Sequence, residues 1–371
     1  MRLHTRLLLL LSIIAGTTHA QNDRSASLNI GDPFPPIQVR DWLKGKPFQS
    51  FEKGQVYVLE FWATWCHPCI AFMPHLSALA NEYKDKLTIL GIDIYEEKSS
   101  SLEKVKAFVD SMGKRMDYVV ATMDSSFTGL GWCKALKSEG IPLTLILDTE
   151  GRLAWIGHPK DMDEVLHKIV NNDWDIHEAL AKRNLNKYLA ALDDSLRWDL
   201  MKYDHDTFKP GSIDKPDSTL LMIDEIIKNE PRLKYATHIA YKTFSCLLQT
   251  NSSKAYEYGK VLMVTPVYED PPYGVIVDAI NEYAKKIEFP AEIYELGAAA
   301  YQAKIDHYGE LGNMNIPDRY SKMADMYWRA KNKLKAIDAI QKAMATLKNE
   351  KDFSPTELAL YESLFQQYKK M

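Results

Sequence analysis

The sequence has few cysteines, no strong excess of either charge and no long apolar run beyond its first residues. Four cysteines in 371 residues are too few to build a disulfide scaffold of this size. The net charge of −4 provides no basic field to attract nucleic acid. No glycine-rich phosphate loop, catalytic-triad spacing or dinucleotide-binding fingerprint occurs in the chain. We therefore expect no nucleic-acid partner and no bound cofactor.

The first twenty residues have the pattern of a secretory signal peptide. Met1–Arg6 supplies positive charge, residues 7–15 are almost purely apolar, and small residues surround Ala20. The apolar run is shorter than the roughly 20 residues of a membrane-spanning helix, so we expect cleavage after Ala20 rather than a retained anchor. No other segment is long and apolar enough to cross a bilayer. We expect a mature protein in the periplasm or otherwise outside the cytoplasm, where disulfides persist.

A Cys-x-x-Cys motif, Cys66 to Cys69, follows an apolar strand predicted over Gln55–Trp62 and opens a helix predicted over residues 66–83. The unpaired N–H groups and the dipole at a helix N-terminus favour a thiolate at Cys66. Cys69 lies one turn further in, close enough to form a disulfide with Cys66, and should be more buried. We predict that Cys66 attacks a partner's disulfide and that Cys69 resolves the mixed disulfide.

Strands alternate with helices up to about residue 172. Further strands are predicted at 87–94, 118–121, 140–148 and 152–157, the last two as a hairpin, and further helices at 102–112, 129–138 and 161–170. This order predicts an α/β fold with a mixed central sheet flanked by helices. We expect residues 21–27 to be a linker and residues 28–172 to form this domain.

Helical patterns dominate from about Trp174, and we expect residues 173–371 to form a separate all-α domain. Residues 320–347 have small and large side chains close to the spacing of a tetratricopeptide-type helical hairpin, and residues 236–261 look like a weaker copy. The alternative is pairs of amphipathic helices in an irregular bundle. We expect a concave helical surface that binds an extended polypeptide.

The run Phe61-Trp62-Ala63-Thr64-Trp65-Cys66-His67-Pro68-Cys69, followed by Gly140-Ile141-Pro142, resembles the thioredoxin superfamily. More narrowly it resembles the secreted TlpA/ResA-like thiol–disulfide oxidoreductases. The resemblance covers roughly residues 28–172 and implies a thioredoxin-like fold and an enzyme that exchanges disulfides with protein substrates. It also implies a membrane thiol donor or acceptor that resets the cysteine pair.

The resemblance assigns roles to residues around the cysteine pair. Pro142 corresponds to a cis-proline that faces the active-site disulfide in the family, and the backbone of Ile141 would pair with an extended substrate. The alternative for Pro142 is a trans-proline that only begins an edge strand. Trp65 is expected on the surface that a substrate touches.

Glu60 lies six positions before Cys66, where thioredoxins carry a buried acid. Burial without a charged partner raises the pKa of a carboxyl, and such a group could take the proton from Cys69 as it attacks. The alternative is a glutamate at a partly solvated strand end with a lysine partner. Many ResA-like proteins place a glutamate three residues after the second cysteine, whereas this chain has Phe72, which leaves Glu60 as the only nearby acid.

The two residues between the cysteines indicate opposite directions of electron flow. A protonated His67 would favour the thiolate and a more oxidising pair, although a solvent-facing His67 would have little effect. Pro68, before the second cysteine, matches the reducing members of the family. We favour the reductase direction. Cys133 and Cys246 are expected to be core residues rather than redox centres, because buried cysteine is common in cores.

Three other functions are alternatives to disulfide exchange. Peroxide reduction in this fold needs a threonine three positions before the catalytic cysteine, and Ala63 stands there. A copper or zinc carrier would use Cys66, Cys69 and His67, but one cysteine pair is an incomplete tetrahedral site, so we expect no metal centre. In an interaction protein, the helical domain would be the working part and the cysteine pair a static bond.

Overall fold

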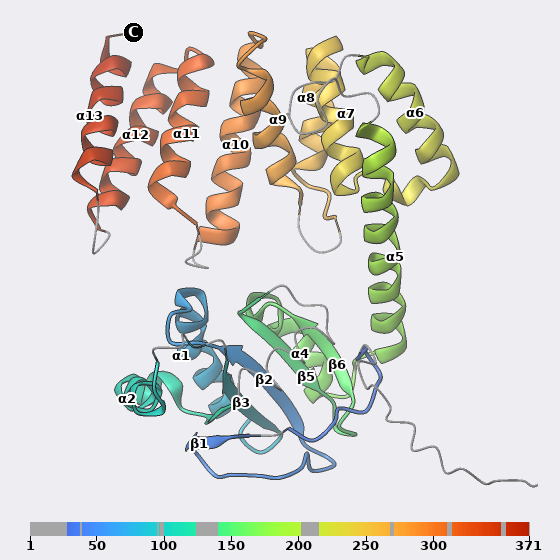
Figure 1. Cartoon of the computed structure of the whole chain (residues 1–371), viewed down its shortest axis with the longest axis vertical. Helices are drawn as coiled ribbons and strands as arrows, with labels where there is room; N and C mark the ends of the chain where they lie inside the picture. The colour runs from blue at the N-terminus through green and yellow to red at the C-terminus, as the bar shows by residue number, and fades with distance from the viewer. Residues whose placement is uncertain are drawn as a thin grey trace, which may run out of the picture.

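The computed structural model describes residues 28–37, 39–94, 96, 100–123, 140–201, 215–267, 271–309, 314–349 and 354–370. These residues form a sheet part, which holds a six-stranded sheet, and a helical part that begins with α5 (Ile176–Met201). Figure 1 shows the helical part as a row of helices beside the sheet part, with α5 as the long helix between them. The signal peptide, the linker, the helix predicted at 129–138 and Cys133 lie outside the described residues.

The sheet has the strand order β1-β4-β3-β2-β5-β6. Its strands are β1 (Asp41–Lys44), β2 (Val56–Trp62), β3 (Leu87–Asp93), β4 (Val119–Thr122), β5 (Leu143–Leu147) and β6 (Leu153–Gly157). The strands β2, β3 and β4 run parallel, while β1, β5 and β6 run antiparallel to their neighbours. The predicted mixed sheet is therefore confirmed, and β1 is an addition that the sequence pattern did not predict.

Strand β2 is buried along its whole length, as expected for a central strand covered on both faces. Val58 and Trp62 point to the face covered by α1 (His67–Glu82), α2 (Leu102–Met112) and α4 (Asp163–Val170). Tyr57 and Phe61 point to the other face, which packs against aromatic residues of the segment before β2. Burying each large apolar side chain contributes about 1.5–3 kcal/mol, so the end of β2 is held firmly. The cysteine motif begins at that end.

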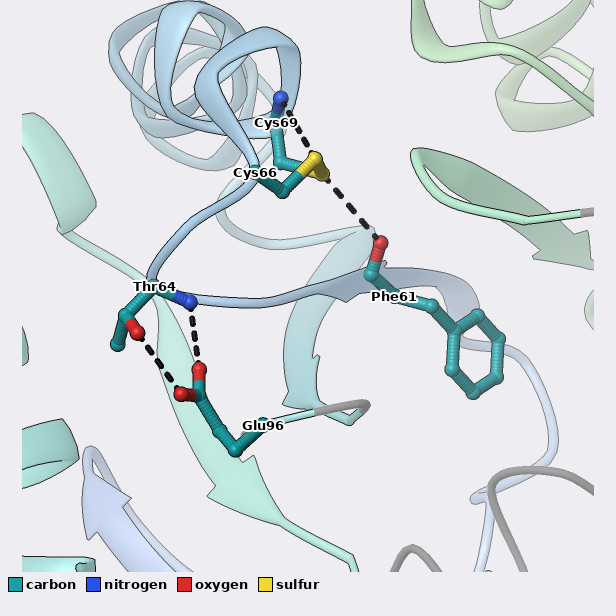
Figure 2. Close-up of a disulfide and its surroundings, with 5 residues drawn as sticks. All are labelled: Phe61, Thr64, Cys66, Cys69 and Glu96. Atoms are coloured by element: carbon teal, nitrogen blue, oxygen red, sulfur yellow. Dashed lines mark hydrogen bonds between the residues drawn. A yellow bond between two sulfur atoms is a disulfide. The ribbon is translucent and has the colours of Figure 1, made fainter. Parts of the chain in front are cut away.

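Helix α1 begins at the cysteine pair. Cys66 is its N-cap, and the sulfur of Cys66 accepts a hydrogen bond from the Cys69 N–H at 3.3 Å, as Figure 2 shows. Pro68 lies in the first turn, where a missing N–H costs nothing because the first helical N–H groups have no partner within the helix. The predicted strand-to-helix junction is confirmed to within one residue.

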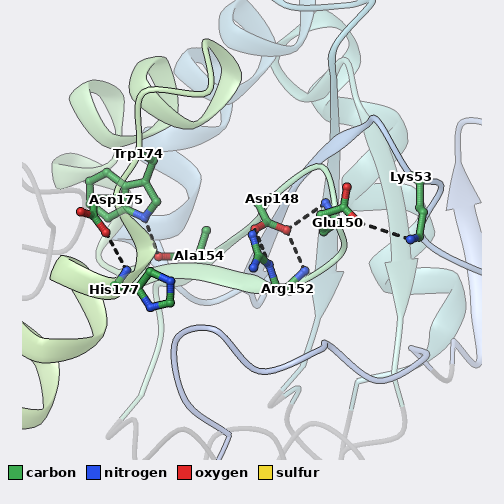
Figure 3. A network of polar contacts seen from close by, with 8 residues as sticks. All are labelled: Lys53, Asp148, Glu150, Arg152, Ala154, Trp174, Asp175 and His177. Carbon is green, nitrogen blue, oxygen red and sulfur yellow. Dashed lines mark hydrogen bonds and ion pairs between the residues drawn. The ribbon is translucent and has the colours of Figure 1, made fainter.

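The hairpin of β5 and β6 is closed by Asp148 (Figure 3). Its carboxylate accepts hydrogen bonds from the backbone N–H groups of Glu150 and Arg152, at 3.0 and 2.9 Å, and from the Arg152 side chain at 2.9 Å. Beyond the hairpin, the indole of Trp174 donates to the carbonyl of Ala154 in β6 at 3.0 Å. This bond ties the segment before α5 to the sheet.

The residues described after β6 form helices and no further strand. Besides α5, the long helices are α6 (Pro216–Asn229), α7 (Thr237–Thr250), α8 (Ser252–Leu262), α9 (Tyr273–Tyr283), α10 (Ala291–Tyr308), α11 (Ile316–Arg329), α12 (Lys333–Lys348) and α13 (Pro355–Lys369). Short 3-10 helices occur at Gly113–Met116, Pro159–Asp161 and Pro231–Leu233. No helix in the described ranges combines the length and the apolar character needed to span a membrane.

Helices α11 and α12 form a close pair at the place where a helical hairpin was predicted. Ala324, Ala336 and Ala343 are buried between helices, where small side chains let two backbones approach. A turn that contains Lys331 and Asn332 joins them, and Asn332 caps α12 through the N–H of Lys335. Whether this pair is one unit of a repeat stays a prediction.

The two parts also touch through Lys160, which follows β6. Its ammonium lies 3.0 Å from Nε2 of His307 and 5.9 Å from the ring centre of Tyr308, both at the end of α10. In addition, the side-chain amide of Asn29 donates a hydrogen bond to the side-chain oxygen of Asn184 in α5 at 2.9 Å. The helical part is therefore in contact with the sheet part through both α5 and α10.

Candidate active site

The two cysteines form the disulfide predicted from their spacing. Their sulfur atoms lie 2.06 Å apart and their Cα atoms 5.3 Å apart. Cys69 is completely buried and Cys66 is 2% exposed, so both sulfurs lie within the protein. The side chain of Cys69 also lies 4.0 Å from the carbonyl oxygen of Phe61, at the end of β2 (Figure 2).

The helix start gives the reduced pair an electrostatic bias. The first turn of α1 holds no acidic residue, so the partial positive charge of the helix N-terminus is not offset there. A thiolate at Cys66 would accept the N–H of Cys69, the hydrogen bond already made by the sulfur. His67 is exposed, and Trp65 exposes 48% of its surface. Cys66 is therefore covered while its neighbours are open to solvent.

The Ile141–Pro142 segment lies at the same end of the sheet as the disulfide. Leu143 pairs with Phe61 in the antiparallel ladder of β5 and β2, so the residues before Leu143 lie beside those after Phe61. The peptide bond between Ile141 and Pro142 is cis in the structure. Both residues are partly exposed, and the role assigned to them by family resemblance stays a prediction.

Glu60 is fully buried in the middle of β2, and neither of its carboxyl oxygens has a hydrogen-bond partner among the described residues. The alternative of a solvated strand end with a lysine partner is therefore wrong. Burial raises the pKa of Glu60 to about 8, because the surrounding protein cannot solvate the carboxylate as water does. The carboxyl can thus change its protonation state near neutral pH.

Glu96 belongs to the site, although sequence reasoning missed it. Its carboxylate accepts hydrogen bonds from the backbone N–H and the hydroxyl of Thr64, at 2.6 and 2.8 Å (Figure 2). Thr64 lies in the turn between β2 and Cys66, so Glu96 holds the turn that carries the nucleophile. The available signal was an acid shortly after strand β3, because the carboxyl ends of parallel strands meet at one edge of a sheet.

Asp93, the last residue of β3, is in hydrogen-bond contact with the side chain of Glu96. Burial raises the pKa of Asp93 to about 8. A hydrogen bond with Glu96 and the negative charge of Glu96 also contribute to this rise, whereas the positive charge of Arg40 opposes it. A neutral Asp93 can donate a hydrogen bond from its carboxyl O–H to the Glu96 carboxylate, whose oxygens also accept from Thr64. The two acids therefore act as one unit behind the cysteine turn.

We expect the Glu96→Gln substitution to loosen the cysteine turn. An amide keeps one acceptor oxygen but directs an N–H₂ group at a donor of Thr64, so the loss should be about 1–3 kcal/mol in the free energy of unfolding. Urea denaturation of the oxidised protein measures it. Thr64→Val should lose part of the same energy, whereas Thr64→Ser, which keeps the hydroxyl, is the control. Equal stability of Glu96→Gln and the wild type would contradict this role.

The remaining candidates take places away from the disulfide chemistry. Phe72, which replaces the glutamate of many relatives, packs edge-on against His158 at 5.4 Å between ring centres. Cys246 is buried in α7, in the helical part. In the described part of the chain, no three His, Cys, Asp or Glu side chains lie close enough together to hold a metal ion.

Comparisons with known proteins agree with this geometry. The thioredoxin family model matches residues 43–110. The protein FixW of Rhizobium leguminosarum is 32% identical over 155 residues, which are 40% of this chain and 70% of FixW. The thiol:disulfide interchange protein DsbE of Pasteurella multocida is 30% identical over 151 residues, 39% of this chain and 76% of DsbE. The thiol-disulfide oxidoreductase ResA of Geobacillus kaustophilus is 28% identical over 158 residues, 42% of this chain and 84% of ResA.

Solved structures give matches of similar extent. The thioredoxin domain of a thiol-disulfide oxidoreductase from Bacteroides vulgatus is 22% identical, covers 39% of this chain and 99% of that domain, and has a TM-score of 0.33. A thiol:disulfide interchange protein from Bacteroides sp. is 23% identical, covers 39% of this chain and 92% of that protein, and also has a TM-score of 0.33. Each of these matches spans less than half of the chain described here.

Proposed function

The chain belongs to the thioredoxin family and is a thiol–disulfide oxidoreductase, and from this premise we propose that it reduces disulfides in proteins outside the cytoplasm through Cys66 and Cys69. The observation that carries the proposal is the cysteine pair at the N-terminus of α1, joined as a disulfide. The signal-peptide pattern of the first twenty residues supports the location.

The reaction starts from the reduced pair. The Cys66 thiolate attacks one sulfur of the substrate disulfide, that bond breaks, and the released substrate thiolate takes a proton from solvent. Cys69 then loses its proton to the ionised fraction of Glu60 and attacks the Cys66 sulfur. The bond between Cys66 and the substrate breaks, and the second substrate sulfur leaves as a thiolate that takes a proton from solvent. The substrate has gained two electrons and two protons, and the enzyme holds the Cys66–Cys69 disulfide. A thiol donor must reduce it, and we propose that this donor is membrane-bound.

Substrate contact is proposed at the open rim of the pair. Trp65 is an exposed large apolar residue next to Cys66, and the backbone of Ile141 lies beside the end of β2. An extended substrate segment would pack on Trp65 and pair with the backbone of Ile141. Cys66 is only 2% exposed. The bound segment must therefore displace the side chains that cover Cys66 before the substrate disulfide can reach the Cys66 sulfur.

The helical part is proposed to select the protein substrate. Figure 1 shows α1 on the side of the sheet part that faces the helices, and Lys160 joins that side to His307 and Tyr308. A polypeptide that reaches the cysteine pair would thus approach beside the helical row. This supports a substrate that is extended and flexible rather than a compact domain.

The reduction potential of the cysteine pair tests the direction. We expect a value near that of thioredoxin, about −270 mV, measured by equilibration with glutathione, together with reduction of insulin as a model disulfide substrate. A value near −120 mV would make the protein an oxidant instead. Stoichiometric copper or zinc on the isolated protein, with no reduction of insulin, would point to a metal carrier.

A further inference from the structure

The helical part holds a cavity between the start of α9 and the end of α10. Its volume is about 370 Å³, and cavities that bind ligands have volumes of about 300–1,000 Å³. Among the described residues that line it, Lys304 is the only charged one. Most of the others are apolar or aromatic: Val267, Pro271, Pro272, Tyr273, Val275 and Tyr308. The cavity therefore combines apolar walls with a single ammonium group.

The ammonium of Lys304 has no ion pair or hydrogen bond within the described part of the chain. The side chain is half-buried, and a Cβ on Gly274 would lie 3.8 Å from its Nζ and 3.9 Å from Oδ2 of Asp278. Burial lowers the pKa of Lys304; the charge of Asp278 opposes this, whereas the charges of Arg319 and Lys322 add to it. A half-buried ammonium without a partner favours an anion that enters the cavity.

The start of α9 adds to this preference for an anion. Tyr273, Gly274 and Val275 are the first three residues of α9, and all of them line the cavity. The first turn of α9 contains no acidic residue, so the partial positive charge of the helix N-terminus is not offset within that turn. The walls and the charges together fit a ligand in which a carboxylate lies next to an apolar group.

A line of contacts joins the cavity to the helix that carries the cysteines. Phe72 lies one turn of α1 beyond Cys69, and its ring packs edge-on against His158 at 5.4 Å between ring centres. Two residues after His158, the ammonium of Lys160 lies 5.9 Å from the ring centre of Tyr308, which lines the cavity. These steps together span on the order of 20 Å, the reach of about six residues of extended chain.

We propose that the cavity beside Lys304 binds an acidic side chain of the extended polypeptide whose disulfide is exchanged at Cys66. The carboxylate of this side chain pairs with the Lys304 ammonium, and an apolar neighbour in the polypeptide packs on the walls near Pro272 and Tyr308. A free inorganic anion would leave these apolar walls uncovered, which favours a polypeptide as the occupant. The inference rests on the proposed function and names its substrate class: segments with an acidic and an apolar residue about six residues from the reactive cysteine.

Competition between two peptides for Cys66 tests the site. In Cys69→Ala the mixed disulfides at Cys66 persist, and a glutathione buffer lets them reach equilibrium. One peptide carries Phe-Asp about six residues from its single cysteine, and the other, marked by an isotope label, carries Phe-Asn. Tethering through Cys66 raises the local concentration of the tested residues, so a weak contact becomes measurable. We expect about tenfold more adduct of the acidic peptide by mass spectrometry, and equal amounts would overturn the proposal.

Variants of the cavity separate this contact from a general attraction of charges. Lys304→Gln, added to Cys69→Ala, should abolish the preference. Lys322→Gln is the matched control, because it removes the same charge nearby, but its ammonium pairs with Asp318 at 2.8 Å. Gly274→Leu should also abolish the preference, since a Cβ there has no contact closer than 3.8 Å and the larger side chain has room beside Lys304. A preference that survives both cavity variants, or falls equally in Lys322→Gln, would overturn the proposal.

The titration of Lys304 gives a readout that does not depend on the amount of adduct. Carbon NMR of labelled lysine follows it, and the Lys304 signal is identified by its loss in Lys304→Gln. A carboxylate beside the ammonium raises the pKa of lysine, so Lys304 should titrate at higher pH in the acidic adduct than in the neutral one. If neither peptide forms an adduct, the proposed function fails at Cys66. The wild type is then titrated with a cysteine-free acidic peptide, and an unmoved Lys304 signal would overturn the inference itself.

Discussion

Replacing Cys66 with serine is expected to lower the rate of disulfide reduction by about 10³-fold or more, the scale on which enzymes lose activity without their covalent nucleophile. A serine hydroxyl is not ionised near neutral pH and cannot form a mixed disulfide, so the first step of exchange has no nucleophile. The effect should appear in the turnover of insulin or another protein disulfide with a chemical thiol as electron donor. The fold should persist, because serine is smaller than cysteine and the position lies at a helix N-cap that suits it.

Cys69→Ala separates the two steps of the same reaction. Cys66 should still attack, but the mixed disulfide should accumulate because no second thiol resolves it. Non-reducing electrophoresis and mass spectrometry of the purified adduct show both the trapped protein and the cysteine used. Cys246→Ser, at a buried position in the helical part, is the control and should retain turnover. Full turnover in Cys66→Ser would mean that the bond is only structural.

Much of the site could be predicted because its parts are close in sequence. Cys66 and Cys69 lie within one helical turn, and the apolar run of β2 before them fixes where that turn begins. Glu60 stood out as the one charged residue in a strand of core residues. The structure places it fully buried, since β2 has neighbours on both edges and side chains on both faces. The local sequence pattern was therefore sufficient to predict the positions of these three residues.

The contacts that pattern did not reveal join segments far apart in the chain. Glu96 lies 32 residues after Thr64, and the ring of Tyr118, the residue before β4, lies over Gly91 of β3. Neither pair has a periodic signal, because each depends on how parallel strands are ordered in the sheet. Strand β1 was missed for a similar reason, since it is a four-residue edge strand that pairs only with β4. The helices of the helical part could be predicted from the sequence, but which helices pack against each other could not.

Glu60→Gln is expected to stabilise the oxidised protein in mildly alkaline solution. The pKa of Glu60 is 4.5 in an unperturbed chain and about 8 in the folded protein, so between these values folding requires uptake of a proton. Stability therefore falls as pH rises from about 4.5 to 8 and levels off above that. A pKa change of this size corresponds to about 5 kcal/mol of stability lost by pH 8–9. Glutamine is neutral at every pH and removes this loss.

Urea denaturation of the wild type and Glu60→Gln between pH 5 and pH 9 measures the effect. The two proteins should be similar at the acidic end, and the variant should gain several kcal/mol at the alkaline end. Glu150→Gln is the matched control, because Glu150 is exposed and pairs only at the surface with Lys53. Parallel stability curves for Glu60→Gln and the wild type would show that Glu60 is not buried as a neutral acid. The same variant should resolve mixed disulfides more slowly, since Cys69 loses its proton acceptor. The Glu60 carboxyl therefore lowers the stability of the fold at alkaline pH while it speeds the resolution of mixed disulfides.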